Sequence, residues 1–214
     1  MGAALKVALI DYDMGNLRSI ANAIHHIGDY QVDVTADPAV IRHADCLILP
    51  GVGAYPDAMA SLRGKELLPV LNEQVLEQRK PVLGICLGMQ LLFDSSAEGG
   101  RHAGLGWIPG SVELMQLAPE FRIPHVGWND LQVQQNSRFF SSLGDDKNFY
   151  FVHSYHAVCA PEHVIATFEY DHVMTAAVRR DNVVGMQFHP EKSQLNGMRV
   201  LQEFMTWAKE SAHA

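Results

Sequence analysis

Apolar runs alternate with amphipathic segments through the first half of the chain. The runs that we expect to form buried strands cover residues 6–10, 31–35, 46–49 and 82–86. The segments whose apolar residues have helical spacing cover residues 16–27, 66–78 and 89–93. Strands that alternate with helices are typical of a parallel sheet covered by helices, which binds ligands at the carboxyl ends of its strands.

The second half of the chain has a different pattern. Its apolar segments are short, contain β-branched or aromatic residues and are joined by turns, and they cover residues 112–114, 131–133, 148–153, 164–170, 174–178 and 183–188. We expect antiparallel additions to the sheet here, followed by a closing helix over residues 197–209. Because no linker rich in Pro, Gly or Ser divides the chain, we predict one α/β domain over residues 1–214. Its central sheet should be mostly parallel, flanked by helices and continuous through both halves.

A possible nucleophile lies at the end of the 82–86 run, in the sequence Gly-Ile-Cys-Leu-Gly at 84–88. A sharp strand-to-helix turn lifts a nucleophile clear of a sheet, and the flanking glycines leave room for a strained central residue. The free N–H groups and the positive end of the next helix's dipole stabilise a thiolate over a thiol. We therefore predict that Cys86 is a nucleophile.

The segment His189-Pro190-Glu191 supplies a candidate base and a group to orient it, because it follows the strand-like residues 183–188. The spacing lets Glu191 accept a hydrogen bond from one ring nitrogen of His189 while the other nitrogen faces Cys86. Taken alone, this segment is more typical of a surface turn. The cysteine motif makes the catalytic interpretation the stronger one.

A glycine-containing loop at 50–55 follows the 46–49 run directly. Its glycines let the backbone approach a ligand, and the N–H groups of Val52 and Gly53 are candidates for an oxyanion hole together with that of Leu87. An ordinary strand-to-helix turn is the alternative. No Gly-Lys-Ser/Thr follows, so the loop resembles a phosphate-binding loop only weakly.

The charge balance restricts the possible partners. Among the 214 residues, 16 Lys and Arg face 24 Asp and Glu, which gives a net charge of −8, and no basic cluster is present. We therefore expect no nucleic acid partner. No apolar run approaches the roughly 20 residues of a membrane span, so we also expect no membrane partner.

The cysteines indicate the compartment. Cys46, Cys86 and Cys159 are odd in number and lack the spacing of a metal site. This pattern is typical of a reduced, cytoplasmic protein without disulfides. We expect neither a metal nor another cofactor.

Three motifs in this order, Gly-Ile-Cys-Leu-Gly-Met-Gln around Cys86, the loop at 50–53 and Gln-Phe-His-Pro-Glu-Lys-Ser at 187–193, resemble class I (triad) glutamine amidotransferases. The resemblance spans nearly the whole chain and implies a flavodoxin-like sheet. It also implies that Cys86 attacks the side-chain amide of glutamine, His189 transfers protons and Glu191 orients His189. A glutamyl thioester forms and is hydrolysed as ammonia leaves.

The same resemblance implies contacts to the substrate glutamine. The side chains of Gln90 and Glu98 match family positions that bind glutamine, and Gly51, Ser154 and Tyr155 match positions that present backbone groups.

Within the family, the chain is most similar to the glutaminase subunits of imidazole glycerol phosphate synthases, enzymes of histidine biosynthesis. The segments that carry this similarity are 11–17, 50–55, 125–129, 150–155 and 190–193. The similarity implies a partner, a (β/α)8-barrel cyclase subunit that accepts the ammonia. It also places Asn16, Trp128, Tyr150 and Lys192 at the interface with that partner, although an exposed Trp or Lys in such loops is equally typical of packing and solvation.

Other interpretations remain open. The same triad serves amidotransferases of pyridoxal phosphate, anthranilate, aminodeoxychorismate and purine synthesis. A hydrolase or peptidase with the same turn, or a non-catalytic flavodoxin-like binding protein, would also fit the fold.

Overall fold

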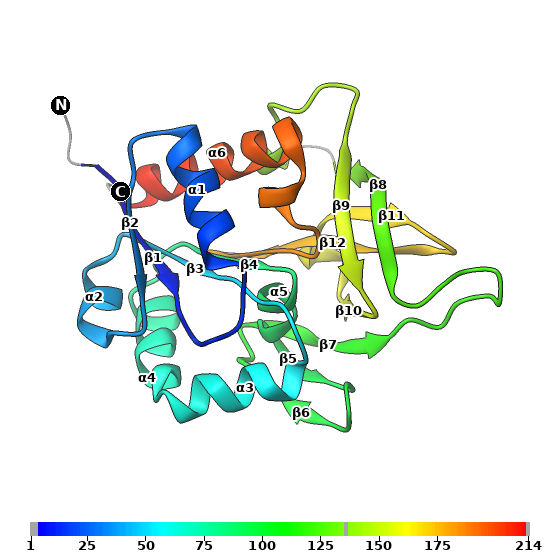
Figure 1. Cartoon of the computed structure of the whole chain (residues 1–214), viewed down its shortest axis with the longest axis horizontal. Helices are drawn as coiled ribbons and strands as arrows, with labels where there is room; N and C mark the ends of the chain where they lie inside the picture. Colours follow the sequence, from blue (N-terminus) through cyan, green and yellow to red (C-terminus); the bar gives the residue numbers. More distant parts are fainter. Residues whose placement is uncertain (1–3, 135–136, 213–214) are drawn as a thin grey trace.

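The computed structural model describes residues 4–134 and 137–212, and the ends of the predicted domain, residues 1–3 and 213–214, lie outside this range. Within the described residues, a nine-stranded sheet runs through both halves of the chain (Figure 1). Its strands in spatial order are β2 (Gln31–Thr35), β1 (Lys6–Ile10), β3 (Cys46–Leu49), β4 (Val82–Ile85), β13 (Val183–Met186), β12 (Val173–Arg180), β11 (Val164–Glu169), β8 (His125–Val133) and β9 (Asn148–His153). The first five strands in this order, β2, β1, β3, β4 and β13, are parallel to one another. The remaining neighbouring strands pair antiparallel.

A second, four-stranded sheet lies beside the first. Its strands in order are β10 (Tyr155–Cys159), β7 (Ile108–Leu114), β5 (Phe93–Ser96) and β6 (His102–Ala103). The α-helices are α1 (Leu17–Ile27), α2 (Pro38–His43), α3 (Tyr55–Gly64), α4 (Leu67–Asn72), α5 (Leu87–Leu91) and α6 (Gln194–Ser211). A π-helical turn at Glu73–Glu77 continues α4, and single 3-10 turns lie at Arg138–Phe140, Pro161–His163 and Pro190–Lys192.

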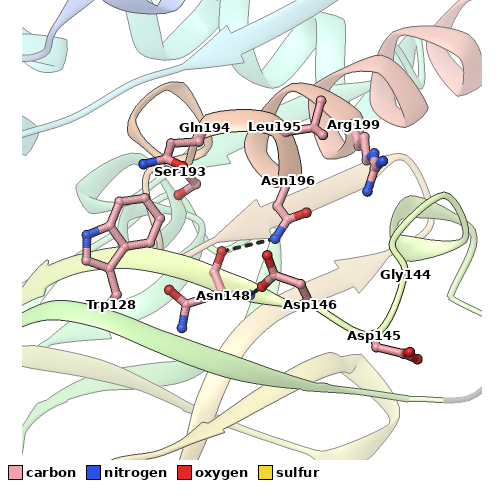
Figure 2. Close-up of a pocket in the computed structure, with 10 residues that line it drawn as sticks. All are labelled: Trp128, Gly144, Asp145, Asp146, Asn148, Ser193, Gln194, Leu195, Asn196 and Arg199. Atoms are coloured by element: carbon pink, nitrogen blue, oxygen red, sulfur yellow. Dashed lines mark hydrogen bonds between the residues drawn. The ribbon is translucent and has the colours of Figure 1, made fainter.

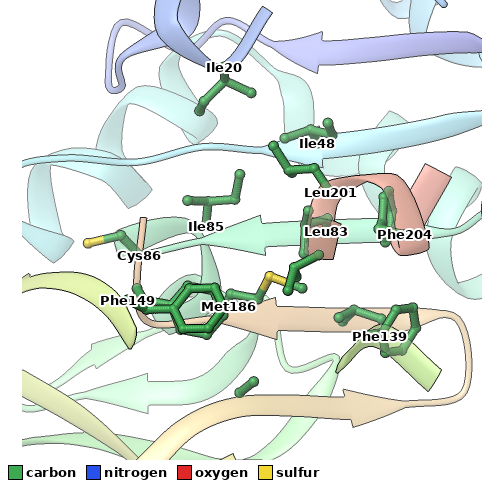
Figure 3. Packing of buried hydrophobic residues seen from close by; sticks show 14 of the residues in the cluster. Ile20, Ile48, Leu83, Ile85, Cys86, Phe139, Phe149, Met186, Leu201 and Phe204 are labelled. Carbon is green, nitrogen blue, oxygen red and sulfur yellow. The ribbon is translucent and has the colours of Figure 1, made fainter. Parts of the chain in front are cut away.

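The parallel strands are apolar at successive positions because helices cover both faces of the sheet. Along β3, Cys46 and Ile48 face one layer and Leu47 and Leu49 face the other. Helices α1 and α6 pack on the first face, and α2 to α5 pack on the second (Figure 1). Figure 3 shows the first layer, where Cys86 lies at the end of the cluster with its sulfur directed away from the labelled apolar side chains.

The α/β fold with a mostly parallel sheet flanked by helices is confirmed. Two details of the prediction are wrong. The segment at 183–188 was expected as an antiparallel addition, but β13 is parallel to β4 because β12 reverses direction before it and lies on its other side. The segment at 112–114 belongs to β7 in the second sheet, where it pairs with β10.

Helix α5 also lies two residues earlier than predicted, over Leu87–Leu91. The expected helix at 89–93 begins already at Leu87, and Phe93 starts β5 because it pairs with Ile108. No helix within the described residues is long and apolar enough to cross a membrane.

The carboxyl ends of four adjacent parallel strands supply the loops that carry the predicted site. Strand β1 leads to residues 11–16, β3 to the loop at 50–54, β4 to Cys86 and β13 to His189. Side chains from distant parts of the sequence therefore meet at one edge of the sheet.

Close packing at Gly88 fixes the position of α5 against β3. A Cβ atom at Gly88 would lie 1.9 Å from the carbonyl oxygen of Leu49, which is backbone and cannot turn aside. We expect Gly88→Ala to lower the free energy of unfolding by about 1–3 kcal/mol or more. The control Gly64→Ala lies in α3 with no atom within 4 Å of the added Cβ, and should be neutral or stabilise slightly. Urea unfolding midpoints test this, and equal midpoints for the two variants would contradict it.

Candidate active site

Cys86 occupies a strained turn between β4 and α5. Its backbone has φ 53° and ψ −112°, a combination that a side chain with a Cβ rarely adopts. Its N–H donates to the carbonyl of Met186 at 2.7 Å, which ties the turn to β13. A Cβ at Gly84 would lie 2.7–2.8 Å from the backbone of Gly88 and Met89, so the turn requires glycine there. The predicted strand-to-helix turn is present.

His189 and Glu191 form a buried pair beside this turn. The Nδ1 atom of His189 lies 2.8 Å from Oε1 of Glu191, and both side chains are almost inaccessible to solvent. Because a carboxylate only accepts, Nδ1 carries the hydrogen and Nε2 is free to exchange a proton. Nε2 is buried and has no hydrogen-bond partner among the described residues.

The charge state of His189 follows from its neighbours. Burial lowers the pKa of His189, but Cys86 and Glu191 both favour the charged imidazolium and together raise this pKa to about 9. This value lies above the ordinary 6.5, so the interaction stabilises the fold fully below about pH 6.5 and is lost as the pH rises through about 9.

The other two cysteines lie in environments that suppress reactivity. Burial raises the pKa of Cys46 strongly and raises that of Cys159 to about 11, with Glu162 adding to the second shift. Since the thiolate is the nucleophile, neither thiol is suited to attack near neutral pH. Cys86 differs in lying beside a histidine and at the start of a helix.

A pocket of about 240 Å³ opens onto Cys86. Its lining residues are Val52, Gly53, Cys86, Leu87, Gln90, Glu98, Pro124, Val152, His153, Ser154, Tyr155 and His189. The volume is below the range of about 300–1,000 Å³ that is typical of sites for drug-sized ligands. The pocket therefore suits a small metabolite.

The structure brings most of the predicted substrate and oxyanion residues to this pocket. They are Val52, Gly53, Leu87, Gln90, Glu98, Ser154 and Tyr155. Gly51 lies behind the pocket wall instead, and a Cβ there would lie 2.8 Å from the nitrogen of Gly88. The amide nitrogen of Gln90 donates to the carbonyl of Tyr155 and to Oε1 of Gln187, each at 3.0 Å, so it has no hydrogen left for a ligand.

The loop at 51–54 is anchored at both ends. The buried hydroxyl of Tyr12 donates to the carbonyl of Pro50, and burial raises the pKa of Tyr12, which keeps this hydroxyl protonated. At the other end, Oε2 of Glu98 accepts a 2.9 Å hydrogen bond from the N–H of Tyr55. The predicted oxyanion loop is therefore held between two fixed points.

Three of the predicted interface residues lie together beside the pocket. Trp128 and Tyr150 are cross-strand partners on β8 and β9, with ring centroids 5.9 Å apart, and the ammonium of Lys192 lies 5.6 Å from the Tyr150 ring. The carbonyl of Tyr150 accepts a 2.9 Å hydrogen bond from the N–H of His189. Asn16 lies in the loop after β1, next to Gly15, where a Cβ would be 3.1 Å from Pro50.

A second hollow lies beyond Trp128, between the loop at 144–148 and the start of α6. Figure 2 shows its polar lining, which includes Asp145, Asp146 and Arg199. It contains none of the predicted catalytic residues. No group of three or more His, Cys, Asp or Glu in residues 4–134 and 137–212 is arranged to hold a metal ion.

Two residues near the sulfur had no predicted role. Gln187 is fully buried, and its Nε2 lies 3.8 Å from Sγ of Cys86, while His153 lines the pocket. Gln187 stands two positions before His189, and residues two apart in extended backbone face the same side. That spacing is the sequence signal that could have placed Gln187 at the site.

The chain matches the family described as glutamine amidotransferase class-I over residues 8–207. The chain belongs to this family. A Vibrio vulnificus (strain YJ016) protein named imidazole glycerol phosphate synthase subunit HisH 2 is 57% identical over 205 residues, 96% of each chain. A Methanococcus maripaludis protein of the same name is 43% identical over 203 residues, which cover 94% of this chain and 100% of that one.

A solved structure agrees with the fold of this glutamine amidotransferase. PurLQS from Thermotoga maritima matches with a TM-score of 0.69 at 22% identity, over 96% of this chain and 99% of that chain. At this identity the similarity concerns the fold alone.

The pairing of Cys86 with His189 can be tested by titration. We expect Cys86→Ala to lower the pKa of His189 from about 9, because burial is then opposed by Glu191 alone. NMR of ¹⁵N-labelled histidine measures this pKa, and Cys159→Ala, outside the pocket, is the control. An unchanged titration of His189 in Cys86→Ala would show that the two groups do not interact.

Proposed function

We propose that this chain is the glutaminase subunit of an imidazole glycerol phosphate synthase and supplies ammonia to a (β/α)8-barrel cyclase in histidine biosynthesis. The observation that supports this most strongly is the meeting of Cys86, His189 and Glu191 at one small pocket in a chain 57% identical to a subunit of that name. The free thiols of Cys46, Cys86 and Cys159 support a cytoplasmic location.

The first half of the proposed reaction forms a thioester. Nε2 of His189 takes the proton of the Cys86 thiol, and the sulfur attacks the side-chain carbonyl carbon of glutamine. The N–H of Leu87, at the start of α5, and those of Val52 and Gly53 are the proposed donors to the developing oxyanion. His189 then donates its proton to the amide nitrogen, the C–N bond breaks and ammonia leaves.

The second half hydrolyses that thioester. His189 removes a proton from water, the resulting hydroxide attacks the carbonyl carbon and the C–S bond breaks. His189 returns its proton to the departing sulfur, glutamate leaves and the Cys86 thiol is restored. Glu191 keeps the hydrogen on Nδ1 of His189 throughout, so that Nε2 serves as the proton carrier.

A partner is needed because ammonia released into neutral water is protonated and loses its nucleophilicity. We propose that the cyclase docks on Asn16, Trp128, Tyr150 and Lys192 and closes a dry path for ammonia. The exposed apolar side chains of Ile123, Val126 and Trp128 support a docking surface on this side of the pocket. Since Tyr150 accepts a hydrogen bond from the backbone of His189, docking there has a direct connection to the proposed base.

The proposal predicts that glutamine hydrolysis depends on the partner. We expect the chain alone to release little glutamate, and the complex with cyclase and its nucleotide ligand to be at least about tenfold faster, because the oxyanion donors become correctly placed only in that complex. A coupled glutamate assay measures this, with Cys86→Ala as the blank. Equal rates with and without the liganded cyclase would contradict this proposal and favour another amidotransferase partner.

A further inference from the structure

Gln187 is a fully buried polar side chain that the proposed mechanism does not use. It follows β13, and its backbone N–H donates to the carbonyl of Ala176 at 2.8 Å, which fixes the residue against β12. Its amide nitrogen lies 3.8 Å from Sγ of Cys86, within the range of an N–H···S hydrogen bond. The carbonyl of Val152 also lies 3.8 Å from the sulfur.

The orientation of the Gln187 amide is determined by its neighbours. The amide nitrogen of Gln90 faces both the carbonyl of Tyr155 and Oε1 of Gln187. Because the carbonyl of Tyr155 can only accept, the Gln90 atom that faces it must be nitrogen, and its second hydrogen then needs an acceptor. The oxygen of Gln187 meets that need. The NH₂ group of Gln187 must therefore face Cys86.

Two histidines extend this ordering, His153 at the pocket and His125 behind it. Nδ1 of His153 lies 2.9 Å from the carbonyl of Tyr155, so it carries the hydrogen, and Nε2 of His153 accepts from Nδ1 of His125 at 3.2 Å. Burial lowers the pKa of His153 to about 3, which keeps this ring neutral at physiological pH. The direction of every hydrogen bond in the network from His125 to Gln187 is therefore determined.

We propose that Gln187 is a positioning residue that donates a hydrogen bond to the sulfur of Cys86 and thereby favours and orients the thiolate. A charge-assisted hydrogen bond is roughly twice as strong as a neutral one, so the donor stabilises the thiolate more than the thiol or the thioester. The same donor assists both steps in which the thiolate takes part, attack on glutamine and departure in hydrolysis. This role rests on the proposed function only in taking Cys86 as the nucleophile.

The charged and titratable groups around the sulfur are few. His189 lies beside it with Glu191 behind, and the hydroxyl of Tyr12 is close enough for Cys86 to affect its pKa. Gln187 is the uncharged donor of this set. Removing its NH₂ group therefore leaves the net charge of the site unchanged.

The test measures alkylation of Cys86 by iodoacetamide across a range of pH, with mass spectrometry of the Cys86 peptide. Gln187→Met keeps the volume but removes both the donor to the sulfur and the acceptor for Gln90. For this variant we expect the profile to shift to higher pH and the rate at neutral pH to fall about tenfold. In the cyclase complex, kcat should fall while KM for glutamine stays unchanged. The control Gln74→Met removes a buried amide far along the chain and should alkylate as wild type does.

Gln187→Glu covers the case in which Gln187→Met does not fold. It keeps the acceptor for Gln90 but replaces the donor by a carboxyl group, so alkylation should slow at least as much. A wild-type alkylation profile in either folded variant would overturn the proposed role. Because alkylation requires no glutamine hydrolysis, slowed alkylation in a protein without glutaminase activity would reject the proposed function and leave the role of Gln187 standing.

Discussion

The absence of side-chain volume at Gly84 and Gly88 is the constraint on which the site depends. Leu49 and Pro50 at the end of β3, the β4 turn and the first turn of α5 all meet at distances that exclude a Cβ atom. This contact places the N-terminus of α5 beside the loop at 51–54 and forces Cys86 into a conformation that costs on the order of 1–3 kcal/mol. The surrounding apolar layers on both faces of the sheet offset that cost.

Burial and neighbouring charges together determine the protonation of the histidines around the turn. His153 is buried without a charged partner and stays neutral, whereas His189 is buried between Cys86 and Glu191 and favours the charged form. Two histidines in one small region therefore differ in protonation because one has anionic neighbours and the other does not. This difference suits His189 to the proposed acid–base role, whereas the neutral His153 orders the hydrogen bonds of its neighbours.

The sequence predicted the family and the fold class because both depend on local signals. The apolar runs of the parallel strands, the glycines around Cys86 and the His-Pro-Glu segment are each read within a few residues. The second sheet was missed because Phe93 fits the end of a helical pattern, and only its pairing with Ile108 shows that it starts a strand. Gln187 was missed because its role depends on Gln90 and Tyr155, which come from other elements. The structure brings the predicted catalytic and substrate residues together, apart from Gly51, and their roles stay predictions.

The fold presents one cysteine, Cys86, at the pocket, and we propose that it alone is the nucleophile toward glutamine. The most direct measurement is peptide mass spectrometry after incubation of the liganded complex with a glutamine analogue that carries a diazoketone in place of the side-chain amide. We expect one adduct, on Cys86, that excess glutamine prevents and that Glu191→Gln slows. An adduct on Cys46 or Cys159, or labelling of Cys86 that glutamine does not prevent, would contradict it.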